Sequence, residues 1–352
     1  MRTQLLSVMI QLLFLGSLLT TLMWYKLNDR IMKHYRREPK MKSAPRKSCK
    51  NCGEDIEEVL KIYSQTWKKQ EANYQNFSSK LSLECNGPEM AIITQTNTPL
   101  GSKIVYDGER FRTLQVDQGM FNNFAKENPF PKKKWHTCAV VGNGGILGNS
   151  NCGKMIDSAQ FVIRCNLPPL TDEYKKDVGV KTNLVTANPT IFLRKYGALI
   201  GRRLPLMEKL RIYGNSLLLL PPFSFAMNTA VSLRVLYTVE DFGGPVQPVF
   251  INPDYLYNVS LFWRSQGLKA VRPSTGIIMA SLALELCENV DLYGFWPFAV
   301  HPYSFHELTN HYYDSQKVGS FHAMPVEFKL LLQLHSQGVI RLNLGDCEPD
   351  DY

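Results

Sequence analysis

A short apolar run that leads into a glycine-rich turn constrains the fold of this chain more than any other feature. Residues 139–141 are Ala-Val-Val, and Gly142-Asn143-Gly144-Gly145 follow directly. Glycine has no side chain and tolerates positive φ, so such a turn lets the backbone approach a ligand closely. A second run, Phe161-Val162-Ile163, ends shortly before Asn166. Asn143 and Asn166 thus follow two predicted strands, where α/β proteins bind ligands, although either asparagine could instead form a turn.

Apolar runs and helical patterns alternate from about residue 91 to the end of the chain. Strands separated by helices of this length predict an α/β fold, in which a Rossmann-like, mostly parallel sheet is covered by helices on both faces. The predicted strands span residues 137–141, 160–165, 184–187, 216–220, 248–251, 290–293 and 339–344, and the predicted helices span residues 190–199, 205–213, 254–266, 276–287 and 325–337.

The net charge of +9 belongs to the N-terminal segment of the chain. The first 50 residues contain eleven Lys/Arg and two Asp/Glu, whereas residues 51–352 contain 29 of each. A neutral domain lacks the basic footprint of nucleic-acid-binding proteins, so no nucleic-acid partner is expected.

Residues 5–25 form an uncharged stretch of 21 residues, long enough to span a bilayer as a helix. We predict a cytoplasmic tail (1–4), a transmembrane signal anchor (5–25), a stem (26–90) with a helix-like run from Asp55 to Gln75, and a lumenal domain (91–352). A cleaved signal peptide is the alternative to the anchor.

The orientation of this span is predicted from conflicting signals. Most flanking positive charges follow the span, which by the positive-inside rule would place its C-terminal side in the cytosol. Two glycosylation sequons, at Asn76 and Asn258, and eight cysteines favour the lumen instead. Large C-terminal domains can translocate regardless of charge, so the lumenal orientation is preferred.

Four sequence blocks occur in a fixed order along the domain. They run from Cys138 to Leu170, from Arg272 to Phe298, from His311 to Asp314 and from His322 to Glu327. In this order they resemble the L motif, the S motif, motif III and the very short motif of the eukaryotic sialyltransferases. The likeness is strongest to the α2,8-sialyltransferase branch and extends over nearly all of the domain.

This resemblance implies a variant glycosyltransferase A fold and a catalytic domain that uses CMP-sialic acid as the donor. The implied donor- or substrate-binding residues follow predicted strands or begin predicted helices: Asn143, Asn166, Asn188, Pro189, Thr190, Ser274, Thr275, Gly276 and Trp296. Backbone N–H groups of the glycine turn and of the predicted helix start at 274–276 suit a phosphate. Ser274 and Thr275 could instead only cap a helix, and Trp296 could belong to the core.

Two histidines carry the predicted chemistry. An inverting sugar transfer needs a general base for the acceptor hydroxyl, and the ordinary pKa of histidine suits that role near neutral pH. By resemblance, His322 is the base and His311 stabilises the leaving phosphate; a structural role is the alternative for each. Glu327 is expected to be structural. Related ganglioside enzymes have a histidine before the motif III histidine, where this chain has Asn310.

The resemblance also implies two disulfides, Cys138–Cys287 and Cys152–Cys347, whereas spacing alone leaves the pairing of the cysteines open. Cys165 is expected to be a buried free thiol. No Asp-x-Asp sequence occurs in the chain, so no metal ion or other cofactor is expected, in agreement with the family. The resemblance further implies a single-pass type II protein of the Golgi membrane. A homodimer is compatible with it.

The expected acceptor is a glycolipid. Tyr106-Asp107-Gly108-Glu109 and Leu167-Pro168-Pro169-Leu170 are most similar to the ganglioside disialosyl synthases, which convert GM3 to GD3 by adding sialic acid to the 8-hydroxyl of a terminal sialic acid. Sialylated O-glycans, other glycoproteins and other gangliosides are alternative acceptors.

Two further readings belong to other function classes. A dinucleotide-binding oxidoreductase requires Gly-x-Gly-x-x-Gly and an acid about 20 residues later. Here Leu147 takes the place of the third glycine and Arg164 ends the next run. A non-catalytic lumenal glycan-binding module could reuse the same fold, but it would not need the predicted base, His322.

Overall fold

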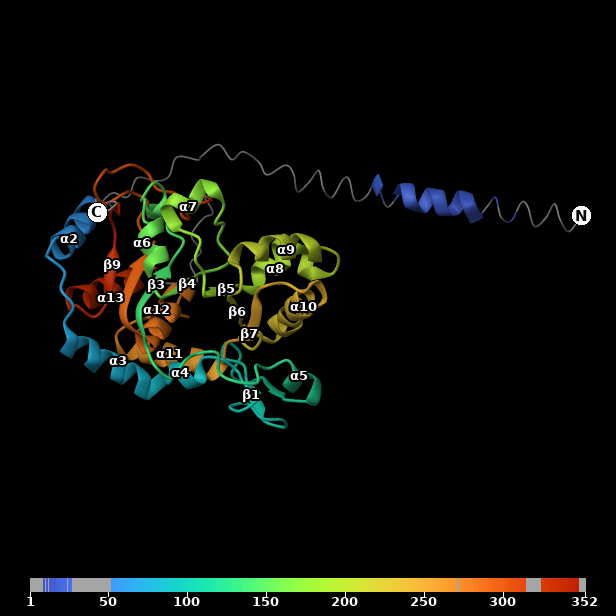
Figure 1. Ribbon diagram of the computed structural model, residues 1–352, viewed down its shortest axis with the longest axis horizontal. Coiled ribbons are helices and arrows are strands. Elements are labelled where there is room, and N and C mark those ends of the chain that lie inside the picture. The colour runs from blue at the N-terminus through green and yellow to red at the C-terminus, as the bar shows by residue number, and fades with distance from the viewer. Residues whose placement is uncertain are drawn as a thin grey trace, which may run out of the picture. The chain divides into compact units, whose positions relative to one another are not determined.

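A seven-stranded parallel sheet forms the centre of the fold (Figure 1). The computed structural model describes residues 52–270, 272–314 and 324–347, together with Met9, Gln11, residues 13–23, Tyr25 and Lys26. The chain divides into two units, residues 1–51 and 52–352. In the order β7-β6-β5-β4-β3-β8-β9, the strands are Gln247–Phe250, Leu217–Leu220, Leu184–Thr186, Phe161–Arg164, Trp135–Val141, Cys287–Tyr293 and Arg341–Asn343.

Side chains alternate along the strands between two apolar layers. In β3, Cys138 and Val140 belong to one core, whereas Ala139 and Val141 belong to the other. Because successive side chains of a strand point to opposite faces, both faces of this sheet are buried, as the apolar runs predict.

Helices cover each face of the sheet and supply the rest of both cores. The core of Cys138 and Val140 includes α2 (Cys52–Tyr63), α3 (Glu71–Cys85), α11 (Pro253–Ser265), α12 (Thr275–Leu286) and α13 (Met324–Ser336). The core of Ala139 and Val141 includes α6 (Gly153–Ser158), α7 (Asp172–Val178), α8 (Pro189–Tyr196), α9 (Arg203–Leu210) and α10 (Ala226–Phe242). Shorter elements are α4 (Gly87–Met90), α5 (Gln118–Asn122) and an antiparallel pair, β1 (Lys103–Val105) with β2 (Thr113–Gln115).

The order of the strands creates a switch point between β3 and β8. From β3 the chain moves through β4 to β7 on one side, and β8 and β9 then pair on the other side. Loops that leave two neighbouring parallel strands in opposite directions open a crevice at the carboxyl ends of the strands. The glycine turn follows β3, so it lies at this crevice.

The N-terminal boundary differs from the prediction. The predicted stem extends to residue 90, but α2 and α3 lie in the same compact unit as the sheet. Ile56, Tyr74 and Leu81 are at most 1% exposed and belong to the core around α12. The predicted helix-like run from Asp55 to Gln75 is also interrupted, because residues 64–70 are not helical. Mixed composition suggested a spacer here, but one apolar stripe per helix is sufficient for packing.

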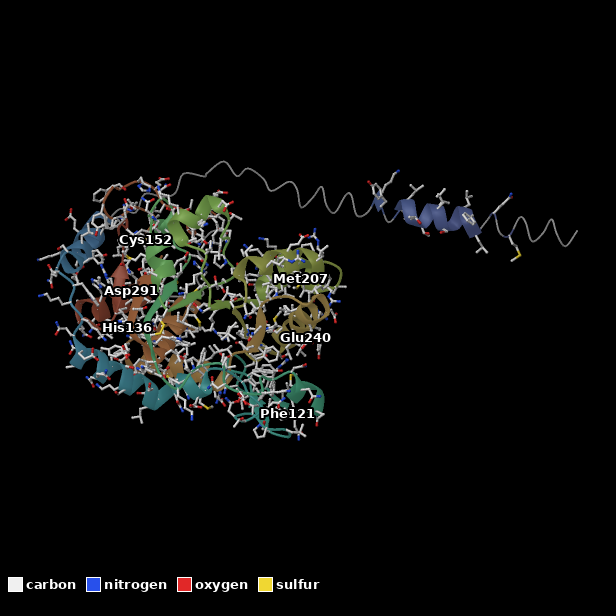
Figure 2. The ribbon with its side chains drawn as sticks, viewed as in Figure 1. Phe121, His136, Cys152, Met207, Glu240 and Asp291 are labelled. Carbon is white, nitrogen blue, oxygen red and sulfur yellow. A yellow bond between two sulfur atoms is a disulfide. The ribbon has the colours of Figure 1, made fainter. Side chains whose placement is uncertain are left out.

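Both disulfides implied by the family resemblance are present. Cys138–Cys287 joins the neighbouring strands β3 and β8, and Cys152–Cys347 attaches the C-terminal segment to the start of α6, where Cys152 is labelled in Figure 2. Cys85 and Cys165 are buried free thiols, and Cys165 was predicted as one.

Residues 13–23 are helical. Among the described residues, none of the helices combines the length and apolar character needed to cross a bilayer. The span predicted for residues 5–25 includes residues outside the described part of the chain, and it stays a prediction.

Candidate active site

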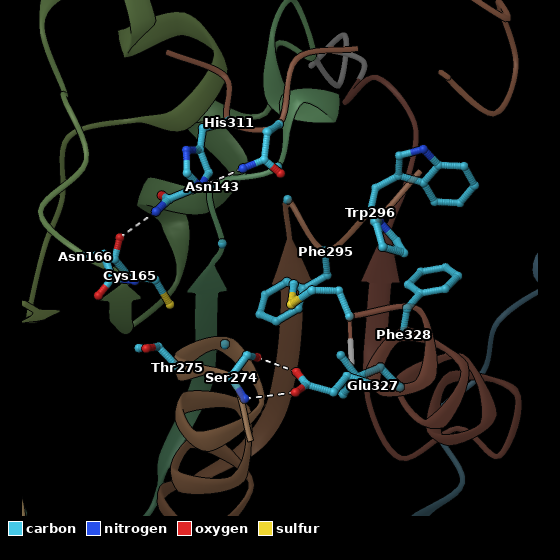
Figure 3. Close-up of a pocket in the computed structure, with 18 of the residues that line it drawn as sticks. Asn143, Cys165, Asn166, Ser274, Thr275, Phe295, Trp296, His311, Glu327 and Phe328 are labelled. Atoms are coloured by element: carbon cyan, nitrogen blue, oxygen red, sulfur yellow. Dashed lines mark hydrogen bonds between the residues drawn. The ribbon is translucent and has the colours of Figure 1, made fainter. Parts of the chain in front are cut away.

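A cavity of about 320 Å³ lies at the switch point of the sheet (Figure 3). The loops after β3, β4, β5 and β8 line it, together with the first turns of α12 and α13. Most of the predicted site residues meet here: Asn143, Asn166, Asn188, Ser274, Thr275, Gly276, Trp296 and His311. We call this space the first cavity.

Asn143 lines the first cavity, and its side-chain amide has an unused hydrogen-bond acceptor. Its Nδ2 donates to the carbonyl oxygen of Cys165 at 2.9 Å, which fixes the orientation of the amide (Figure 3). Its Oδ1 is buried and has no hydrogen-bond partner among the described residues. A buried acceptor without a partner is costly, so this atom suits a ligand that brings an N–H or O–H donor.

The glycines of the turn have a different role from the predicted one. Gly142 N–H donates to the carbonyl of Tyr293 and Gly144 N–H to that of Gly294, at 2.8 and 3.0 Å. A Cβ on Gly142 or Gly144 would lie 2.8 or 2.6 Å from the Gly294 oxygen. These glycines therefore allow two strand ends to approach each other, and their two N–H groups are not available to a phosphate.

The first turn of α12 supplies the remaining backbone donors. Ser274 caps this helix, because its Oγ accepts a hydrogen bond from the N–H of Ile277. The N–H groups of Thr275 and Gly276 have no intrahelical acceptor at this position, and the helix dipole makes this end attractive to anions. Thr275 and Gly276 line the first cavity, so an anion there can meet the helix start.

Glu327 of α13 holds the start of α12 in place. Its Oε1 accepts from the N–H of Ser274 at 2.9 Å, and its Oε2 accepts from the Ser274 hydroxyl (Figure 3). Both residues are buried, with 3% of Glu327 and 7% of Ser274 exposed. Glu327 was predicted to be structural, but its partner Ser274 cannot be identified from the sequence, since 53 residues separate the two. The only signal was a carboxylate in the first turn of an apolar helix.

His311 is oriented by a carboxylate three residues later. Its Nδ1 lies 2.8 Å from Oδ1 of Asp314, and its ring stacks on Tyr313 with centroids 5.3 Å apart. If Asp314 accepts the proton of Nδ1, Nε2 is the nitrogen left for a ligand or for the nearby Asn310 amide, 3.4 Å away. The contact with Asp314 also fixes the direction in which the ring of His311 faces the first cavity.

An aromatic wall closes another side of the first cavity. Trp296 is only 6% exposed, and its indole N–H donates to the carbonyl of Val300 at 2.8 Å. Its ring packs on Phe298 and Phe328. Trp296 therefore lines the cavity and also belongs to the core, and its role in donor binding stays a prediction.

A second cavity of about 540 Å³ adjoins the first cavity, because Asn188 and Thr275 line both. Pro189 and Thr190, predicted with the donor site, line only this second cavity. An ion pair that the sequence analysis did not identify stands beside it: Arg272 Nη2 lies 2.8 Å from Asp107 Oδ2. Burial raises the pKa of Asp107, and the positive charge of Arg272 opposes that effect.

Three predictions are not decided by this geometry. His322, the predicted base, lies outside the described residues. Asn76 is exposed on α3 and Asn258 is half-buried on α11, so their glycosylation stays a prediction. Within the described part of the chain, no group of three or more His, Cys, Asp or Glu side chains could hold a metal ion.

Comparison with known proteins identifies the family. The model of glycosyltransferase family 29 (sialyltransferase) matches residues 92–339. Human alpha-2,8-sialyltransferase 8E is 46% identical over 79% of this chain and 73% of its own length. The alpha-N-acetylneuraminide alpha-2,8-sialyltransferase of Xenopus tropicalis is 44% identical over 84% of this chain and 86% of its own length. A crystal structure of a mammalian sialyltransferase, 21% identical, covers 83% of this chain and 86% of its own with a TM-score of 0.42. The chain belongs to glycosyltransferase family 29, the sialyltransferases.

Proposed function

We propose that this protein is an inverting α2,8-sialyltransferase that moves sialic acid from CMP-sialic acid to the 8-hydroxyl of a terminal sialic acid on a glycolipid, as in the conversion of GM3 to GD3. One observation carries the donor part of this proposal. Asn143, the first turn of α12 and His311 line the same cavity. A donor with a hydroxyl- and amine-bearing nucleoside at one end and a phosphate at the other matches these features.

The chemistry follows from the bonds that change. The bond between the anomeric carbon of sialic acid and the phosphate oxygen breaks, while the acceptor oxygen bonds to that carbon from the opposite face, which inverts its configuration. His322 takes the proton of the acceptor hydroxyl. The departing CMP gains negative charge, which the N–H groups of α12 and a hydrogen bond from His311 stabilise. The protein's groups are sufficient for this route, and we propose that no metal ion takes part.

The second cavity supports the acceptor part of the proposal. It adjoins the first cavity at Asn188 and Thr275, so an acceptor there would reach the donor from the side. The Xenopus relative is named for an acetylneuraminide acceptor. We propose the same acceptor sugar here, and a protein held in the Golgi membrane by residues 5–25 with its catalytic domain in the lumen.

A direct assay tests this function. Full-length protein is incubated with labelled CMP-sialic acid and, separately, GM3, a sialylated glycoprotein and a galactose-terminated glycolipid, and the new linkage is determined. We expect a disialylated product from GM3 with an α2,8 bond. Transfer to the glycoprotein alone would refute the glycolipid acceptor, and transfer only to galactose would refute the α2,8 linkage.

A further inference from the structure

The surface of α8 and α9 concentrates positive charge on an otherwise balanced domain. Residues 189–213 contain six Lys/Arg and one Glu, whereas residues 51–352 as a whole contain 29 of each sign. Arg194, Lys195 and Arg211 are exposed to solvent. Arg194 also lines the second cavity. Arg194 therefore connects this positive charge to the cavity proposed for the acceptor.

A strained loop in this surface presents apolar side chains to water. Gly197, Ala198 and Leu199 have consecutive φ values of 56°, 54° and 62°. Residues other than glycine adopt this region at a cost, and such strain is often found at functional sites. Here it buries Leu199, at 3% exposed, and turns Ile200 outward, at 81% exposed. Leu204 follows at the start of α9 and is 50% exposed.

The loop and the second cavity share one surface. Arg234 of α10 donates from Nη1 to the carbonyl of Ala198 at 3.3 Å, which connects that helix to the loop. Met227, the second residue of the same helix, is 71% exposed and lines the second cavity. Helices α8, α9 and α10 lie together in Figure 1, and Met207, labelled in Figure 2, is buried in the core beneath them.

We propose that Arg194, Lys195, Ile200, Leu204, Arg211 and Met227 form a membrane-docking surface that rests on the anionic headgroups of sialylated glycolipids and turns the second cavity toward the bilayer. This inference deepens the proposed function, because a glycolipid acceptor presents its sugars at such a surface. Basic side chains beside exposed aliphatic ones are the combination that binds the interface of anionic membranes. A second copy of this chain fits less well, because it would bring two basic surfaces together.

The test measures contact with lipid and does not require turnover. Ile200→Cys is labelled with a fluorophore in the full chain, which is reconstituted in phosphatidylcholine vesicles with or without GM3 and a spin-labelled lipid. Leu83→Cys is the matched control, because Leu83 is 87% exposed on α3, away from the basic surface. The wild-type chain treated in the same way gives the background from native cysteines.

We expect lipid quenching at position 200 to be at least threefold that at position 83 in anionic vesicles. Raising the salt concentration, or combining the label with Arg194→Gln and Lys195→Gln, should lower it toward the control. Equal quenching at both sites, or none at position 200, would overturn the proposal. Self-quenching that depends on protein density without lipid quenching would assign this surface to a second copy instead.

The outcome separates this proposal from the proposed function. Quenching at position 200 without transfer to GM3 would retain the docking surface and refute the glycolipid acceptor. Transfer to GM3 without quenching at position 200 would retain the glycolipid acceptor and refute the docking surface. Equal thermal unfolding midpoints of the labelled and wild-type chains show that both variants are folded.

Discussion

The carboxylate of Glu327, at the start of α13, accepts hydrogen bonds from both the backbone N–H and the hydroxyl of Ser274, at the start of α12. These two helix starts lie on opposite sides of the floor of the first cavity (Figure 3). The chain positions between the two residues include the entire loop with His311. This buried contact therefore fixes the position of the N-terminal end of α12 relative to the start of α13.

Replacement of Glu327 tests this contact. Glu327→Ala leaves the N–H of Ser274 buried without its acceptor, so the free energy of unfolding should fall by about 1–3 kcal/mol. The KM for CMP-sialic acid should rise as well, because the first turn of α12 loses its support. Denaturant unfolding and donor titration measure the two effects. Glu240→Ala, on the exposed side of α10, is the control and should change neither quantity; an unchanged donor KM in Glu327→Ala would contradict the assignment.

Asn143 should bind the donor directly. Asn143→Ala removes the unpartnered acceptor and should lower kcat/KM for CMP-sialic acid by about 10- to 100-fold, the effect of losing one or two hydrogen bonds. Asn289→Ala is a matched control, because its Nδ2 also donates to a backbone carbonyl at 2.9 Å but lies away from the cavity. Equal activity losses in the two variants would show that Asn143 acts only through folding.

Asp314 should act through His311. Asp314→Asn replaces the carboxylate acceptor of His311 Nδ1 with a neutral amide that holds the ring less firmly, so kcat should fall about 10-fold or more while acceptor KM changes little. In a double-mutant cycle, Asp314→Asn should add little to the loss caused by His311→Ala. Additive losses would mean that the two side chains work independently.

His322 should account for proton removal. His322→Ala should reduce kcat by about 10²- to 10⁴-fold, the range for loss of a general base, with donor binding retained. The pH profile of kcat should also lose its acidic limb, because that limb reports protonation of the base. Binding of CMP, measured by calorimetry, separates loss of chemistry from loss of folding. A variant with nearly normal turnover would remove His322 from the mechanism.

His335 should make the fold sensitive to acid. Its Nδ1 accepts from the N–H of Leu342 at 3.1 Å, and burial lowers its pKa to about 4 from the ordinary 6.5. The unfolded state therefore binds more protons between these pH values. The contribution of neutral His335 to the free energy of unfolding is fully present above pH 6.5, and it is lost as the pH falls toward 4. The loss between pH 7 and pH 4.5 should be about 2 kcal/mol.

A variant isolates this effect from the other titrating groups. Burial raises the pKa of Glu285 to about 6, which opposes the trend of His335 because that acid favours the folded state at low pH. Unfolding free energies of wild type and His335→Asn at pH 7 and pH 4.5 separate the two. The variant should lose less stability between these pH values than the wild type, and an equal loss would contradict the prediction.

The sequence predicted the sheet well because its signal is local. The apolar runs at 161–163 and 218–220 are buried, and any such run separated by helices favours a parallel strand. The seventeen residues of α10 were not predicted, because buried polar residues such as Asn228, Ser232 and Thr238 interrupt its apolar stripe. The start of the catalytic unit was also misplaced, since packing of α3 against α12 depends on contacts some 200 residues apart.

The candidate site shows the same division. Motif resemblance selected Asn143, Thr275, Trp296 and His311, and the fold brings them to one cavity. The positions of these residues at strand ends and helix starts could be predicted from the sequence, because turns and caps depend on neighbouring residues in the chain. Tertiary structure decided that Gly142 and Gly144 serve strand packing and that Pro189 and Thr190 face the second cavity. It also joined Glu327 to Ser274 and Arg272 to Asp107, because burial of a polar group demands a partner, and only the folded chain determines which partner is within reach.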